Sequence, residues 1–154
     1  MLRVLVDTSV LVRLRDRDSP HLATCERALR LLVDSNGEAC LCAQVLIEFW
    51  SAATRPVEAN GLGRSTEEAY LDCHRFQQTM SLLPEPPDIA ERWLRIVRQY
   101  AVQGKEVHDA RLVAFAVAHR LADILTLNPD DFHRYREVTT WTPGQLMEHI
   151  AHGG

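Results

Sequence analysis

Short apolar segments alternate with amphipathic helical segments along this chain of 154 residues. Each apolar run is short and partly β-branched, which is typical of a buried strand. The expected strands cover residues 2–6, 39–42, 81–83, 123–127 and 137–141. This alternation predicts an α/β fold: a three-layer sandwich in which helices cover both faces of a mostly parallel sheet of about five strands.

Helical periodicity is clearest at residues 109–121, where apolar side chains recur three and four positions apart. A Ser-x-x-Glu capping box from Ser65 to Glu68 opens another helix. Two Pro-containing starts, at residues 19–20 and 142–143, are typical of a first helical turn. Further helices are expected at residues 8–14, 43–53 and 89–102. The chain has no repeat and no linker-like segment, so we expect one domain over residues 1–154.

The net charge, the cysteines and the lengths of the apolar stretches argue against several classes of function. The formal net charge of −4 argues against a protein that coats nucleic acid by bulk charge, although local basic patches remain compatible with it. The four cysteines form no Cys-x-x-Cys pair, so we expect reduced thiols in a cytoplasmic protein. No apolar stretch approaches the length needed to span a bilayer, and we expect no membrane partner.

The apolar run at residues 2–6 ends directly on an acid, Asp7. In parallel α/β proteins, sites form at the carboxyl ends of the strands. A carboxylate there is costly to bury unless a positive group meets it. Asp7 has a second interpretation, as the N-cap of the helix expected at residues 8–14. Position alone leaves both interpretations open.

Two further acids occupy unusual places. Glu48 lies three residues after Val45 and four before Ala52, so it shares the core-facing stripe of its helix. Such a carboxylate needs either a cation or a salt bridge to a nearby arginine. Asp109 begins the helix expected at residues 109–121, where it serves either as an N-cap or as a ligand.

Together, Asp7, Glu48 and Asp109 indicate a metal site. A doubly wound sheet can bring these three places to one edge, and clustered carboxylates repel one another unless cations neutralise them. Ligation by oxygen alone, with no matched Cys/His set, favours Mg²⁺ or Mn²⁺. The chemistry that suits such a site is hydrolysis of a phosphodiester by metal-activated water.

The residues around these acids give the chain a family resemblance. It resembles the PIN-domain ribonucleases, and specifically the VapC-type toxins of toxin–antitoxin pairs. The resemblance covers nearly the whole chain and is specific through the order and spacing of four segments. These segments are residues 4–9 (VLVDTS), 46–49 (LIEF), 108–110 (HDA) and 124–132 (ILTLNPDDF).

The resemblance implies a PIN-like fold and Mg²⁺-dependent cleavage of RNA. On the family pattern, Asp7 and Asp109 are the principal metal ligands and Glu48 completes the acidic site, directly or through water. Thr8 or Ser9 would hydrogen-bond near the first acid.

One position departs from the fuller family pattern. Many PIN domains carry a fourth acid just after the late strand, where this chain has Asn128. Asn ligates through its carbonyl but brings no charge, which leaves the number of metal ions open. Asp131 either joins the site or caps a helix before Phe132. Thr126 either points into the pocket or satisfies the sheet edge.

Candidate RNA contacts lie in two basic segments. Arg134 and Arg136 follow the site turn with an aromatic residue between them, and Arg13 lies near the end of the first helix. Phosphate contact and base stacking suit such groups. A solvated loop explains residues 133–136 equally well.

The resemblance also implies partners: an RNA substrate, a cognate VapB-type antitoxin that covers the site, and a second copy of the chain in a homodimer. A groove lined by the first helices would receive the antitoxin. Leu11 and Leu14 are candidates for it, although core packing explains them as well.

Two other functions compete with this interpretation. A phosphatase with a nucleophilic aspartate also places an acid at a strand end. It requires a second acid two residues on, and Ser9 stands there. A catalytically silent RNA-binding or interaction module on the same fold is the other alternative.

Overall fold

A parallel five-stranded sheet with the order β3-β2-β1-β4-β5 forms the centre of the computed structural model, which describes residues 1–153. Every neighbouring pair of strands runs parallel. The strands are β1 (Arg3–Val6), β2 (Glu38–Leu41), β3 (Ser81–Leu82), β4 (Asp123–Leu125) and β5 (Thr139–Trp141). The expected α/β sandwich is therefore confirmed.

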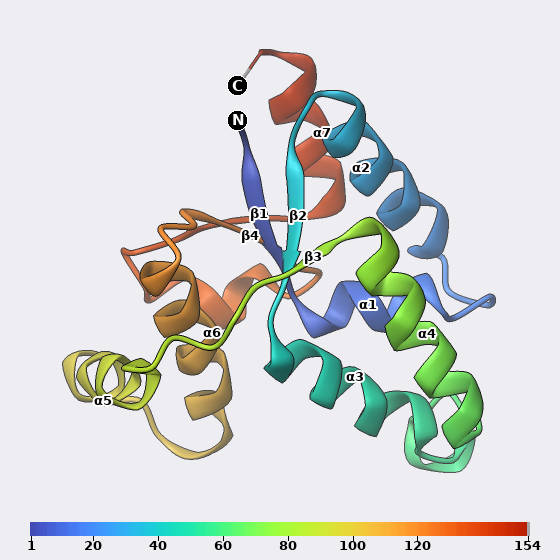
Figure 1. Ribbon diagram of the computed structural model, residues 1–154, viewed down its shortest axis with the longest axis horizontal. Helices are drawn as coiled ribbons and strands as arrows, with labels where there is room; N and C mark the ends of the chain where they lie inside the picture. The colour runs from blue at the N-terminus through green and yellow to red at the C-terminus, as the bar shows by residue number, and fades with distance from the viewer. Residues whose placement is uncertain (154) are drawn as a thin grey trace.

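Seven α-helices connect and cover the strands within residues 1–153. They are α1 (Thr8–Leu14), α2 (Leu22–Asp34), α3 (Ala43–Thr54), α4 (Thr66–Thr79), α5 (Ile89–Gln99), α6 (Val107–Ala118) and α7 (Pro143–Ala151). Three 3-10 turns accompany them, η1 (Val57–Ala59), η2 (Gly104–Glu106) and η3 (Pro129–Phe132). Figure 1 shows α2 beside α7 on one side of the strands and α5 beside α6 on the other.

The core surrounds the central strand. Val4, Leu5 and Val6 of β1 are fully buried, because β1 has a strand on each edge and helices on each face. Leu112 and Phe115 of α6 are equally inaccessible. Because the core fixes β1 and α6 rigidly, the polar residues at the carboxyl end of β1 and in the first turn of α6 have defined positions.

Helix starts follow the sequence signals in two of four cases. Ser65 caps α4, with reciprocal hydrogen bonds to Glu68, and Thr142 caps α7. The start expected at residues 19–20 is wrong, because Ser19 Oγ accepts from His21 N–H in a separate turn and α2 begins at Leu22. The start expected at Asp109 is also wrong, because η2 leads directly into α6 at Val107.

Two helices end earlier than expected. We expected helices to extend to Val102 and Leu121, but α5 ends at Gln99 and α6 at Ala118. In each case the chain turns on a residue in the left-handed region, Ala101 (φ 50°) and Arg120 (φ 57°). After α6, Leu121 N–H bonds to Ala116 O, the pattern of a Schellman cap. The sequence places no glycine at either cap, so the signal for these ends was weak.

The four cysteines are free thiols, as expected. Among residues 1–153, no helix combines the length and the apolar character needed to cross a bilayer.

Candidate active site

Asp7 lies at the carboxyl end of β1 and is 7% exposed. It stands at the N-cap position of α1, yet its side chain makes no capping hydrogen bond. Its Oδ2 instead accepts from Ser9 Oγ and Thr126 Oγ1, each at 2.8 Å. The N-cap interpretation is therefore wrong for this side chain. Burial raises the pKa of Asp7, and the two hydroxyl bonds offset part of that effect.

Thr126, directly after β4, satisfies the sheet edge, and its side chain does not line the cavity. Its N–H donates to Trp141 O and continues the sheet, while its buried hydroxyl donates to Asp7. The same hydroxyl accepts from Asn128 N–H at 3.0 Å. Ser9 Oγ accepts from Leu127 N–H, also at 3.0 Å. The end of β4 and the start of α1 thus hold the Asp7 carboxylate jointly.

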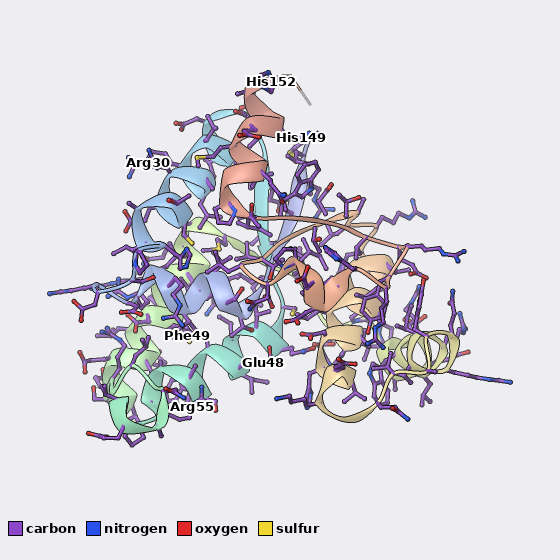
Figure 2. All side chains as sticks on the ribbon, turned by 180° about the vertical axis from the view of Figure 1, so that it is seen from behind. Arg30, Glu48, Phe49, Arg55, His149 and His152 are labelled. Atoms are coloured by element: carbon purple, nitrogen blue, oxygen red, sulfur yellow. The ribbon has the colours of Figure 1, made fainter. Side chains whose placement is uncertain are left out.

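Glu48 is half-buried on α3, between two donors. Thr8 Oγ1 donates to Glu48 Oε1 at 2.7 Å, and Gln44 Nε2 donates to Glu48 Oε2 at 3.2 Å. Among residues 1–153 no arginine pairs with Glu48, so the salt-bridge interpretation is wrong. Figure 2 shows Glu48 on α3, beside the start of α6.

Asp109 lies in the first turn of α6 rather than at its N-cap, which is Glu106. Burial and the charges of Asp7, Asp131, Glu48 and Glu106 raise the pKa of Asp109 to about 7. Each of these charges acts because it lies near Asp109. Acids that are widely separated in the sequence therefore form one electrostatic cluster.

A cavity of about 710 Å³ joins these groups. Its lining includes Asp7, Thr8, Ser9, Arg13, Glu48, Asp109, Asn128 and Asp131. Thr126 lies behind Asp7 and is fully buried. Asn128 is the N-cap of η3 and Asp131 lies within that turn, so the interpretation of Asp131 as a helix cap is wrong.

The three candidate RNA contacts differ in position. Arg13 lines the cavity and pairs with Asp16 at 2.6 Å. Arg134 and Arg136 are exposed and do not line it, and Arg134 pairs with Glu106 at 2.7 Å.

Gln44 is a site residue that the sequence analysis missed. It is 8% exposed and touches both Glu48 and the backbone before Asp109. Its spacing of four residues before Glu48 puts both side chains on one helix face, which is the signal that was available.

The donor set fits a hard divalent cation. Asp7, Glu48 and Asp109 offer carboxylate oxygens, and no lysine or arginine among residues 1–153 forms an ion pair with any of them. In the same part of the chain, no three His, Cys, Asp or Glu side chains stand close enough together to hold an ion. The chemistry of the donors therefore suits a divalent cation, whereas the spacing of these side chains in this structure does not.

Comparisons with known proteins agree with the fold. VapBC2 from Rickettsia felis, bound to a promoter DNA fragment, is 15% identical, with a TM-score of 0.69 over 92% of this chain and 98% of that chain. DNA-bound VapBC from Salmonella typhimurium is 16% identical, with a TM-score of 0.67 over 93% and 99%. The sarcin–ricin-loop-cleaving toxin VapC20 from Mycobacterium tuberculosis is 18% identical, with a TM-score of 0.62 over 88% and 98%.

No curated protein matches the sequence significantly. The sequence profile of the PIN domain matches residues 4–138, which span β1 to the segment before β5. This match covers most of the chain and includes Asp7, Glu48 and Asp109. The chain therefore belongs to the PIN-domain family.

Proposed function

We propose that this protein is a Mg²⁺-dependent endoribonuclease that acts as the toxin of a VapBC-type toxin–antitoxin pair, with Mn²⁺ as an alternative metal. The observation that carries the proposal is one cavity lined by Asp7, Glu48 and Asp109, with no basic side chain among residues 1–153 paired to them. PIN-domain membership supports nuclease activity in general. The identity of the metal ion and the choice of RNA as substrate are proposed in addition to this general activity.

The cavity residues supply the oxygen atoms that would bind the metal ion. Asp7, Glu48 and Asp109 would hold the ion, with Asn128 or Asp131 available as further oxygen donors. When bound, Mg²⁺ supplies positive charge to the scissile phosphate and lowers the pKa of water.

The chain's own hydrogen bonds prepare two of these acids. Ser9 and Thr126 donate to Oδ2 of Asp7, which restrains the carboxylate and favours its ionised form. Thr8 and Gln44 fix both oxygens of Glu48. Glu48 is then the group available to orient or deprotonate the attacking water.

A VapB-type antitoxin and a second copy of the chain are the proposed protein partners. The similar structures from R. felis and S. typhimurium are VapBC complexes, which supports the first. A groove of about 620 Å³ lined by Leu14, Leu29, Val33, Phe76 and Met80 offers apolar contacts for such a partner. Leu11 is fully buried and packs in the core instead.

A cleavage assay tests the proposed activity. Purified protein should cut a fluorescently labelled RNA in Mg²⁺ and stop when EDTA is added. Asp7→Asn and Asp109→Asn should each lower the rate by at least about 100-fold while the protein stays folded, because each removes one ligand charge. Asp130→Asn is the matched control, since Asp130 is 92% exposed in the same region and does not line the cavity.

The outcomes separate the alternatives. RNA binding without Mg²⁺-dependent cleavage would contradict the nuclease proposal and favour the silent binding module. A phosphoryl adduct trapped on Asp7 would favour the phosphatase. Near-normal cleavage by Asp7→Asn would contradict the assigned role of that residue.

A further inference from the structure

The Gln44 amide connects the helix of Glu48 with the helix of Asp109. Its Nε2 donates to Glu48 Oε2 at 3.2 Å and to His108 O at 2.7 Å. Its Oε1 accepts from Arg111 Nη1 at 3.0 Å. The buried side chain therefore uses both N–H groups and its carbonyl oxygen.

Arg111 determines which way this amide faces. A guanidinium only donates, so the amide oxygen must face Arg111 and the amide nitrogen must face Glu48 and His108 O. A flipped amide would set donors against donors and acceptors against acceptors. Arg111 is itself held on its other side, where Nη2 donates to Glu85 Oε1 at 2.9 Å.

The bridge fixes a spacing between two acids that repel each other. His108 immediately precedes Asp109, so a bond to its carbonyl anchors the first turn of α6 against α3. The same nitrogen restrains one oxygen of Glu48. Thr8, in the first turn of α1, restrains the other carboxylate oxygen of Glu48.

We infer that Gln44 is a positioning residue that sets where the Glu48 carboxylate stands relative to Asp109, and that Arg111 orients Gln44. This inference rests on the proposed metal-dependent nuclease function. Gln44 lies outside the cavity lining and acts through Glu48, so we assign it no contact with the metal or with RNA.

Gln44→Met tests the inference, because Met keeps the length and volume of the side chain and removes both donors. We expect kcat to fall about 10- to 100-fold with little change in the KM for RNA, the usual cost of losing a group that orients a metal ligand. Gln77→Met is the matched control, since Gln77 is an exposed helical glutamine that bonds only to a backbone carbonyl.

A double-mutant cycle distinguishes positioning from mere packing between α3 and α6. If Gln44 acts through Glu48, Gln44→Met should have almost no further effect on kcat in a Glu48→Gln background. Packing alone would give the same loss in both backgrounds.

Variants of Arg111 test whether it orients Gln44. Arg111→Met should lower kcat, whereas Arg111→Lys should retain much of the wild-type kcat because it keeps a donor. Arg92→Met, at a similarly exposed ion pair, should leave kcat unchanged.

The result is decisive whether or not RNA is cut. Suppose that the wild type cleaves RNA and that Glu48→Gln is impaired. A Gln44→Met variant with a kcat within twofold of wild type, or additive effects of the two substitutions, would then overturn the inference and leave the proposed function intact. If the wild type does not cleave, the proposed function fails, and calorimetric Mn²⁺ binding replaces kcat in the same cycle. Weaker Mn²⁺ binding that disappears in the Glu48→Gln background supports the inference; additive effects, or no binding, overturn it.

Discussion

Thr126 Oγ1 donates a hydrogen bond of 2.8 Å to Asp7 Oδ2 across 119 positions of the sequence. Both residues follow neighbouring strands, β4 and β1, at the same edge of the sheet. This is the arrangement expected when a parallel sheet builds a site at its carboxyl edge. The bond matters because the carboxylate is almost completely buried, and the donors Thr126 and Ser9 replace part of its lost hydration.

Replacing Thr126 tests this relationship. Thr126→Val keeps the shape of the side chain and removes its hydroxyl, so Asp7 loses a donor and Asn128 N–H loses an acceptor. We predict a loss of about 1–3 kcal/mol in the free energy of unfolding, together with lower nuclease activity. Urea denaturation measures the first quantity. Thr54→Val, which removes only a bond to a helix carbonyl, is the control, and an equal loss there would count against the assigned role.

The acids clustered around Asp109 should make the folded protein less stable as the pH rises. Burial and neighbouring charges raise the pKa of Asp109 to about 7. The folded protein then holds this proton more tightly than the unfolded chain, so its stabilising contribution is present at low pH and is lost as the pH rises through 7. Without metal, the free energy of unfolding should fall by roughly 1 kcal/mol, after solvent screening, between about pH 5.5 and about pH 8. The midpoint of thermal unfolding should fall over the same interval.

Two additions sharpen the pH experiment. Asp109→Asn should flatten the dependence, because the side chain no longer titrates. Mg²⁺ should raise the unfolding midpoint more at about pH 8 than at about pH 5.5, because it binds the ionised carboxylates. A metal-free midpoint that rises over this pH interval would contradict the account.

Replacing Asp72 should lower the stability of the fold strongly and leave the proposed cleavage chemistry unchanged. It is completely buried on α4 and meets two arginines, Arg15 after α1 and Arg64 before α4. Asp72→Asn would leave both cations without their counter-charge, and we predict a loss of about 3 kcal/mol in unfolding free energy. Asp88→Asn, at an exposed pair with Arg92, should cost at most about 0.5 kcal/mol. Similar losses in the two variants would be contrary to expectation.

Local signals in the sequence were sufficient for much of the fold. The apolar run before Asp7 predicted β1, because a strand buried on both faces needs continuous apolar residues. The capping box at Ser65 predicted the start of α4 to the residue, since both partners of that motif lie within one turn. Ala101 and Arg120 gave no such signal, because the left-handed caps they form usually carry glycine.

The site was predictable in part, for the same physical reason. Asp7 and Glu48 were accessible to reasoning because each breaks a local pattern: one acid ends an apolar strand and the other shares a core-facing stripe. Asp109 was singled out at an expected helix start, although α6 begins two residues earlier, at Val107. The contact between Gln44 and Arg111 joins positions 67 residues apart and depends on how α3 packs against α6. Gln44 shares a helix face with Glu48, but nothing in the sequence around Arg111 indicates its contact with Gln44, so only the assembled fold reveals the pair.

Diffraction at the manganese absorption edge, from crystals of the wild-type protein grown with Mn²⁺, tests the central claim most directly. The account predicts an anomalous peak in the cavity, about 2 Å from carboxylate oxygens of Asp7 and Asp109, with Glu48 bound directly or through water. The absence of a peak there at saturating Mn²⁺, or a peak held by other residues, would contradict it.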